Sequence, residues 1–339
     1  MKDLMWWNVG KRERVRGLVV LLSARAFAAV ACSGAAYAAS DDAQSAFEQG
    51  TELNKARRFD EAIQQFSKAV ELSPESHKYH QALFMTYLTT RRGRQGLEAY
   101  KKMAREHPNS PRVRYWLGRI YLQSEALEDA AAAFRQATTL DPKDEHPWLS
   151  LGHVYARLGK DDDAMRAYQE ANRLSPKIAI VHAGLGALYL KKKDDAKALR
   201  ELNEALRLDP SLSDARYSLS LLYERKGELD RAMIEWQRLL DDDPNESNAR
   251  ERLARAYVQK KRYEEAVQEY SMLSQVRQAS PEVFFALGES QVLLAASLDD
   301  PRDRADLVAA ARESFQRVLE LDPKNADATS YLERLKPTH

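Results

Sequence analysis

The sequence predicts an all-α protein, an α-solenoid built from tandem pairs of helices. Three observations lead to this fold class. The chain is self-similar at a fixed period, glycine is scarce, and alanine, leucine, glutamate and arginine are abundant. Those four residue types favour helices, and a fixed period of about 34 residues is typical of repeat architectures. Because a solenoid grows by stacking, the length of 339 residues does not require a second core.

Five columns of residues stay in phase along the chain. Prolines recur at a constant interval, at Pro74, Pro108, Pro142, Pro176, Pro210 and Pro244. Twelve positions before each proline stands a small residue: Ala62, Gly96, Ala130, Ala164, Ala198 and Ala232. Four positions later comes a large apolar one: Phe66, Tyr100, Phe134, Tyr168, Leu202 and Trp236. Two upstream columns hold Gly50, Phe84, Gly118, Gly152, Gly186 and Ser220, and then Leu53, Tyr87, Tyr121, Tyr155, Tyr189 and Tyr223. Five columns do not stay in phase over six periods by chance.

Within each period the columns predict two helices that pack face to face. In each period the first helix is expected to have apolar or small residues at positions 4, 7, 8 and 11, which share one helical face. In the fourth period these are Trp148, Leu151, Gly152 and Tyr155. Its second helix alternates small and large residues, so that ridges of one helix enter grooves of the other: Ala164, Tyr168 and Ala171. Proline ends each period because it cannot continue a helix.

The spacing W-x2-L-G-x2-Y, then A-x3-F-x2-A, then P, resembles the tetratricopeptide repeat. This resemblance implies a right-handed superhelix of about eight helix-turn-helix repeats over residues 43–325, followed by a capping helix and tail at 326–339. The expected repeats are 43–76, 77–110, 111–144, 145–178, 179–212, 213–246, 247–280 and 281–325. The eighth repeat carries an eleven-residue insertion. An insertion of that length is close to three helical turns, so both helices can lengthen without rotating their buried faces.

The net charge of +1 conceals an uneven distribution. Residues 1–38 contain six of the 52 basic residues and two of the 51 acidic ones, which leaves 46 against 49 in the rest of the chain. A slightly acidic body lacks the basic surface that DNA or RNA binding needs, so nucleic acid is not expected as a partner.

Residues 1–38 have the pattern of a secretory signal peptide. A basic stretch at 11–16 precedes an apolar run at 17–30, and Ala36-Tyr37-Ala38 follows, so we expect cleavage after Ala38 and a short linker at 39–42. The alternative is an uncleaved anchor, because residues 17–39 nearly span a bilayer. Either route places the body in the periplasm or cell envelope. A cytoplasmic protein with a mis-assigned start is the remaining alternative.

Cys32 is the only cysteine, and it lies inside this N-terminal segment. An exported body cut after Ala38 therefore has no thiol, which excludes a cysteine nucleophile, a thiolate zinc site and a disulfide. The stretch 29–32 resembles the lipobox of bacterial lipoproteins, and lipidation of Cys32 is an alternative to simple cleavage. Membrane contact is thus expected only through an uncleaved or lipidated N-terminal segment.

The remaining residues give no pattern for catalysis, a cofactor or a metal. His146 and His153 lie on one helical face, with His182 in the next repeat, but the sequence places no third ligand near them. The aspartate runs 161–163 and 241–243 lack the spacing of a calcium loop. We therefore predict that the protein is not an enzyme and has neither cofactor nor metal.

Positions 2, 5, 9 and 12 of each first helix form a second stripe that the packing columns leave unused. The resemblance implies that this stripe lines a concave groove for peptides. Its candidate binding residues are Tyr115, Arg119, Leu149, His153, Ala183, Ala187, Tyr217 and Leu221. We expect these side chains to lie outside the packing and to bind a peptide with apolar side chains and at least one acidic group. The Lys and Asn of the chaperone-binding carboxylate clamp are replaced, for example by Phe47 and Thr51.

These observations predict a protein–protein interaction scaffold or adaptor that binds a protein or peptide in the groove. Two alternatives stay open. The chain is either a non-catalytic regulatory subunit of an envelope enzyme or of a secretion or assembly machine, or a cytoplasmic adaptor. The partner is not visible in the sequence, because a solenoid has the same pattern whatever it holds.

Overall fold

The computed structural model describes residues 41–336, so the predicted signal peptide and Cys32 lie outside the described part. The described residues form helices joined by short turns, and they contain no strand. The chain divides into two compact units between Leu174 and Ser175. We refer to residues 41–174 as the N-terminal unit and to residues 175–336 as the C-terminal unit.

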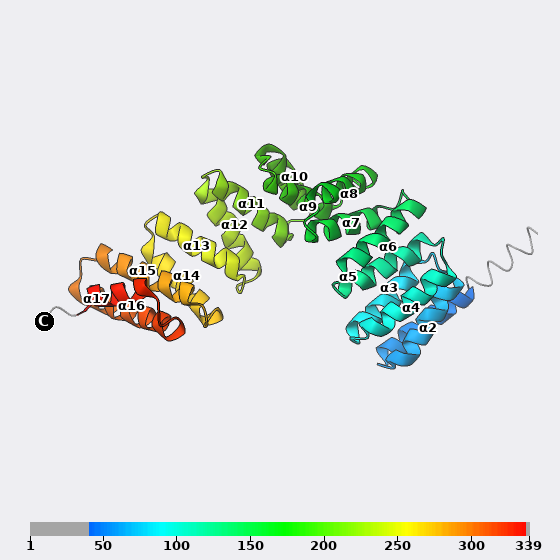
Figure 1. Cartoon of the computed structure of the whole chain (residues 1–339), viewed down its shortest axis with the longest axis horizontal. Helices are drawn as coiled ribbons and strands as arrows, with labels where there is room; N and C mark the ends of the chain where they lie inside the picture. Colours follow the sequence, from blue (N-terminus) through cyan, green and yellow to red (C-terminus); the bar gives the residue numbers. More distant parts are fainter. Residues whose placement is uncertain (1–40, 337–339) are drawn as a thin grey trace, which may run out of the picture. The chain divides into compact units, whose positions relative to one another are not determined.

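The N-terminal unit is a stack of helix pairs (Figure 1). Its first helix covers residues 41–55, and the others are α2 (Phe59–Leu72), α3 (His77–Thr89), α4 (Gly93–Glu106), α5 (Pro111–Gln123), α6 (Leu127–Leu140), α7 (Glu145–Arg157) and α8 (Asp161–Leu174). Helices that follow one another pack together, as in the pairs α5–α6 and α7–α8. A contiguous apolar core runs through these pairs.

The C-terminal unit repeats the arrangement. Its helices are α9 (Ala179–Lys191), α10 (Asp195–Leu208), α11 (Ser213–Arg225), α12 (Leu229–Asp242), α13 (Ser247–Gln259), α14 (Tyr263–Val276), α15 (Pro281–Ser297), α16 (Pro301–Leu321) and α17 (Ala326–Arg334). The closing helix α17 packs on α16, where the Tyr331 ring stacks on Phe315 at 4.6 Å between centroids. Phe315 is completely buried, and the Phe285 ring packs on it as well, at 5.5 Å between centroids.

The glycine column allows the two helices of a pair to approach closely. A Cβ built on Gly118 would lie 2.6 Å from the Phe134 ring, and one built on Gly152 would lie 2.6 Å from the Tyr168 ring. Both rings are buried, so neither can move aside without disturbing the core. The small and large residues of the columns therefore act together: the ring of the second helix occupies the space that the missing side chain of the first helix leaves.

The extra residues of the eighth repeat lie in both of its helices. The odd-numbered helices from α3 to α13 are the first helices of their repeats and have 13 residues each. The even-numbered helices from α2 to α14 are the second helices and have 14. In the eighth repeat α15 has 17 residues and α16 has 21. The gains of four and seven are close to one and two helical turns. The buried face of each helix therefore keeps its orientation, and Gly288 still faces Phe315.

Position 4 of the first helix differs from the prediction. The expectation of an apolar residue there is wrong in the second, third, fifth, sixth and seventh repeats, where the structure shows a histidine or arginine N–H donor instead, and it holds for Ala46 and Phe284 in the first and eighth. Each donor lies within 2.6–3.4 Å of the carbonyl oxygen of the proline six positions earlier. The donors are His80, Arg114, Trp148, His182, Arg216 and Arg250. Tryptophan fits the column because its indole N–H makes the same bond.

In the C-terminal unit three of these donors also contact a glutamate of the following helix, and these contacts are largely buried. His182 contacts Glu201 at 2.8 Å, and Arg216 contacts Glu235 at 2.9 Å. Arg250 pairs with Glu269 in the same way. The two members of each pair are always 19 positions apart, and one such pair occurs in each of three successive repeats. The first helix is thus bonded both to the preceding turn and to its partner helix.

Candidate interaction surface

The eight residues predicted to bind a partner are divided between the two units. Arg119, Leu149, Tyr217 and Leu221 are half-buried, whereas His153 and Ala187 are exposed. Two of the eight are buried, contrary to prediction: Tyr115 is 3% exposed and Ala183 is 9% exposed. The expectation that all eight side chains lie outside the packing is therefore wrong for these two.

Tyr115 is buried because rings from the repeats on either side pack against it. Its centroid lies 6.4 Å from that of His77 and 6.3 Å from that of His146. Trp116 and Phe134 contact the same ring at 5.4 and 5.8 Å. His77 and His146 belong to repeats two apart, and their own rings are 5.6 Å from each other. No spacing rule in the sequence indicates such a contact, since it depends on how three successive repeats turn.

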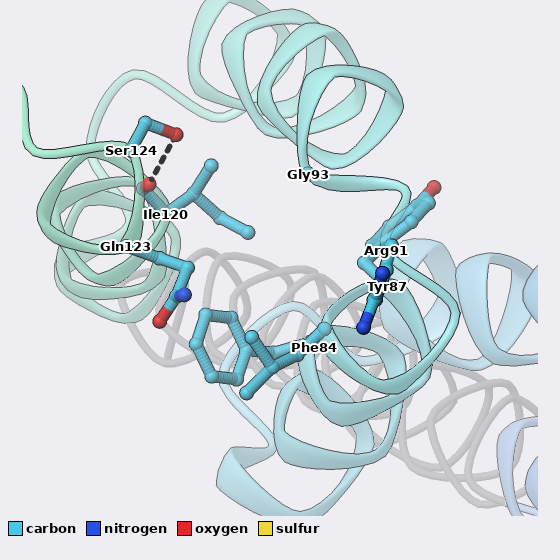
Figure 2. A pocket seen from close by; sticks show the side chains of 8 residues that line it. Phe84, Tyr87, Arg91, Gly93, Ile120, Gln123 and Ser124 are labelled. Atoms are coloured by element: carbon cyan, nitrogen blue, oxygen red, sulfur yellow. Dashed lines mark hydrogen bonds between the residues drawn. The ribbon is translucent and has the colours of Figure 1, made fainter.

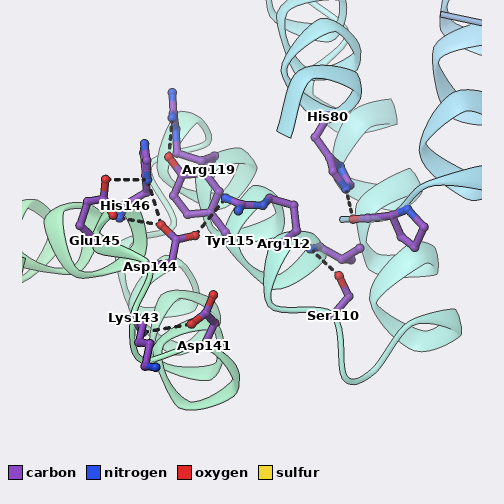
Figure 3. Close-up of polar contacts among 12 residues, drawn as sticks. His80, Ser110, Arg112, Tyr115, Arg119, Asp141, Lys143, Asp144, Glu145 and His146 are labelled. Atoms are coloured by element: carbon purple, nitrogen blue, oxygen red, sulfur yellow. Dashed lines mark hydrogen bonds and ion pairs between the residues drawn. The ribbon is translucent and has the colours of Figure 1, made fainter. Parts of the chain in front are cut away.

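Arg119 is the fixed cation of the N-terminal unit. Its Nη1 donates a 2.9 Å hydrogen bond to the Tyr115 hydroxyl oxygen, as Figure 3 shows. Its guanidinium carbon lies 5.1 Å from the centroid of Phe84 and 5.4 Å from that of Trp116, within the range of cation–π attraction. Within residues 41–336 no carboxylate forms an ion pair with this guanidinium. Most of its donors remain available.

The neighbouring charges at the start of α7 are already paired. Asp144 accepts hydrogen bonds from the His146 backbone N–H at 3.0 Å and from its Nδ1 at 2.9 Å, and its other oxygen accepts from Arg112 Nη1 at 2.9 Å (Figure 3). The bond to Asp144 raises the pKa of His146. The pKa of His77 is lowered by burial and, to a smaller extent, by the charges of Arg112 and His146.

Asp144, Glu145 and His146 bring possible ligand atoms within 4.8 Å of one another. Their arrangement is that of a capped helix start, because Asp144 is the N-cap of α7 and also holds Arg112. A guanidinium bound to the same carboxylate opposes a divalent cation there. The sequence places His182 in the next repeat but assigns it no role as a ligand. His182 is instead held by Glu201 and by the Pro176 carbonyl.

A small cavity opens between α3 and α5, close to Arg119. It has a volume of about 260 Å³, and Figure 2 shows side chains of both helices around it. Phe84, Tyr87, Leu88 and Ile120 supply apolar walls; Arg91, Gln123 and Ser124 are polar, and Gly93 completes the lining. Phe84 is therefore shared between the cavity and the Arg119 guanidinium.

The corresponding stripe of the C-terminal unit has its charges neutralised internally. The Tyr217 hydroxyl accepts a 3.2 Å hydrogen bond from Arg252 Nε, and Arg252 also pairs with Glu224 at 2.5 Å. Ile180, at the start of α9, is 55% exposed. This surface thus presents apolar side chains without a free fixed cation of the Arg119 kind.

None of the helices between residues 41 and 336 combines the length and the apolar character needed to cross a bilayer.

Repeated helix pairs with a partly exposed stripe on their first helices define a class of helical repeat proteins. Family models described as tetratricopeptide repeat match residues 82–145, 179–212, 196–239 and 225–287, and one described as TPR repeat matches residues 152–193. The chain therefore belongs to the tetratricopeptide repeat family. No curated protein matches the sequence.

Solved structures share the fold at low sequence identity. A chain of the APC/C hetero-tetramer Cut9–Hcn1 has a TM-score of 0.55 and 18% identity, over 85% of this chain and 55% of that one. This chain thus spans about half the length of that relative. The C-terminal part of a TPR repeat-containing protein from Cytophaga hutchinsonii has a TM-score of 0.55 and 19% identity, over 76% and 99%. YrrB, described as a TPR protein with an unusual peptide-binding site, has a TM-score of 0.50 and 18% identity, over 60% and 99%.

Proposed function

We propose that this chain is a non-catalytic scaffold that binds a protein or peptide through the exposed stripe of its first helices. One observation carries the proposal: large apolar side chains on this stripe remain exposed although the fold does not use them. Met85 on α3 is 44% exposed and Ile180 on α9 is 55% exposed. Leu149 and Leu221 on the same stripe are half-buried, so each unit offers apolar area on its first helices to a protein partner. The peptide-binding site described for YrrB supports the same function by analogy of fold.

The proposal is tested by capture of the partner with stripe variants. We expect Leu149→Ala, Ile180→Ala and Leu221→Ala each to weaken binding by about 1–3 kcal/mol, as anchors at interfaces do. Gln169→Ala on α8 and Arg238→Ala on α12 are the matched controls, because both side chains are exposed on second helices. Partners captured by affinity purification from envelope extracts would be identified by mass spectrometry, and their dissociation constants measured for each variant. Equal affinity of all three stripe variants and the wild type would contradict a stripe-mediated contact.

We further propose that the body acts outside the cytoplasm, as an envelope scaffold or as a non-catalytic subunit of an envelope enzyme or secretion machine. The order of basic, apolar and small residues before Ala38 supports export. Sequencing of the mature N-terminus should find Ala39, or a lipid-modified Cys32 whose replacement by alanine releases the protein from the membrane. An intact Met1 on protein from the cytoplasmic fraction would instead favour the cytoplasmic adaptor.

A further inference from the structure

The three arginines of α5 differ in whether another group of the chain already binds their charge. Between Pro111 and Gln123 the helix contains Arg112, Arg114 and Arg119 and no acidic residue. Arg112 is paired with Asp144, and Arg114 donates to the Ala104 carbonyl at 3.1 Å. Arg119 has only a neutral hydrogen-bond partner, the Tyr115 hydroxyl. The charge of Arg119 is therefore available to an anion from outside the chain.

The guanidinium of Arg119 is also held in place. The hydrogen bond to Tyr115 and the rings of Phe84 and Trp116 restrict its side chain from three sides. A guanidinium has five N–H donors in a planar fork, and such a fork suits the two oxygens of a carboxylate. Because the side chain is already ordered, binding a carboxylate costs less conformational entropy than it would with a mobile arginine.

The cavity between α3 and α5 supplies a second, apolar subsite. Its volume of about 260 Å³ lies below the roughly 300–1,000 Å³ of sites that hold small-molecule ligands, and it suits a single large side chain. Phe84 forms part of its wall, and the centroid of that ring is 5.1 Å from the Arg119 guanidinium. In an extended peptide, residues i and i+2 point to the same side and are roughly 7 Å apart. Because Phe84 borders both the cavity and the guanidinium, such a pair of residues can reach the two subsites together.

We propose that the N-terminal unit binds a peptide segment of the pattern acid-x-large apolar. The aspartate or glutamate of the segment pairs with Arg119, and the apolar side chain two positions away enters the cavity beside Phe84. This inference rests on the proposed function and specifies the chemical class of partner. The C-terminal unit does not offer the same pairing, because the cation beside Tyr217 is already neutralised by Glu224.

The experiment is a selection of random twelve-residue peptides displayed on phage, with the purified chain as bait. We expect enrichment of an Asp or Glu two positions from Leu, Phe, Ile or Met. The most enriched peptide would then be synthesised with a fluorescent label, together with its acid-to-amide and apolar-to-serine versions. Fluorescence anisotropy should show at least a tenfold loss of affinity for each altered peptide.

Two variants of the chain separate the subsites. Arg119→Gln should lower the affinity for the selected peptide at least tenfold. It should not lower the affinity for the acid-to-amide peptide any further, because in a double-mutant cycle the interaction is already lost in that peptide. Arg119→Lys retains the positive charge but not the planar guanidinium, so its loss of affinity should be smaller than that of Arg119→Gln. Gln123→Trp places a large ring at the exposed rim of the cavity and should make binding insensitive to the apolar-to-serine change. Arg173→Gln, an exposed arginine of α8 paired with Glu170, is the control and should bind as the wild type does.

Helicity and melting of each variant, measured by circular dichroism, distinguish loss of the site from loss of the fold. Selected peptides without an acid, or affinity unchanged by Arg119→Gln in a folded variant, would overturn the proposal. If the selected peptides lack an acid but bind the Leu149→Ala variant more weakly than the wild type, the proposed function stands and only the acidic pattern is wrong. If the selection enriches no peptide although a folded partner is captured from extracts, the surface recognises a folded protein, and the peptide proposal is overturned as well.

Discussion

Acidification from pH 6.5 to pH 4 is expected to lower the free energy of unfolding of the N-terminal unit by about 3 kcal/mol through His80 alone. His80 is fully buried, and burial lowers its pKa to about 4. The charges of Arg112, His77 and His107 act in the same direction, while the hydrogen bond to the Pro74 carbonyl opposes them. In the unfolded chain a histidine has a pKa of about 6.5.

Acidification destabilises the folded state because the two states bind protons at His80 differently. Between pH 6.5 and pH 4 the unfolded state binds a proton at His80 and the folded state does not, so protons favour unfolding. The full stability is present above pH 6.5 and is lost progressively down to pH 4. In the neutral ring, Nε2 donates to the Pro74 carbonyl oxygen at 2.8 Å, and Nδ1 accepts from the Tyr100 hydroxyl at 3.1 Å. A proton on Nδ1 removes that acceptor.

Urea unfolding at several pH values, followed by hydrogen exchange within residues 41–174, measures this effect. His80→Gln keeps an N–H donor for the Pro74 carbonyl but does not titrate, so its stability should depend less on pH between 6.5 and 4. His107→Gln, at the partly exposed C-cap of α4, serves as the control and should retain most of the wild-type dependence, because the His107 charge is the smallest of the influences on the pKa of His80. If His80→Gln and the wild type show the same slope, His80 is not the group responsible.

Glu235→Met is expected to destabilise the C-terminal unit by about 3–5 kcal/mol, the usual cost of removing one member of a buried ion pair. The side chains of Glu235 and Arg216 are 9% and 11% exposed, and their contact is 2.9 Å long. Removal of the carboxylate leaves the Arg216 charge buried, with only the Pro210 carbonyl as a partner. The buried Nε of Arg216 already lacks a partner, so the remaining structure offers little compensation.

The double variant Arg216→Met, Glu235→Met provides the critical comparison. Because two apolar side chains of similar volume leave no buried charge, the double variant should be more stable than Glu235→Met. Arg238→Ala removes only the exposed partner of Glu235 and should change stability by less than about 1 kcal/mol. Thermal and urea unfolding of all three variants give the comparison. A double variant no more stable than Glu235→Met would show that the ion pair acts through packing and not through charge.

The sequence by itself determined the helix pairs, because every column that defines them records a local packing rule. Ala164 and Trp236 are completely buried, as their columns require. The insertion in the eighth repeat could be assigned to helices for the same reason, since helical periodicity fixes how many residues can be added. One further column was present but was missed: Glu201, Glu235 and Glu269 occupy the same position in three successive repeats. An acidic residue on a helix usually faces solvent, so its period alone did not indicate burial.

Only the tertiary structure decided which side chains remain available for a partner. Tyr115 occupies a stripe position that the sequence assigns to the groove, yet His77 and His146 from the repeats on either side cover it. Arg119, one helical turn further on, keeps its charge unpaired above the same ring. Periodicity specifies the face on which a residue lies. Whether that face is covered depends on the rotation between successive repeats and on the sizes of side chains in those neighbouring repeats, and the periodic pattern of a single repeat does not record these.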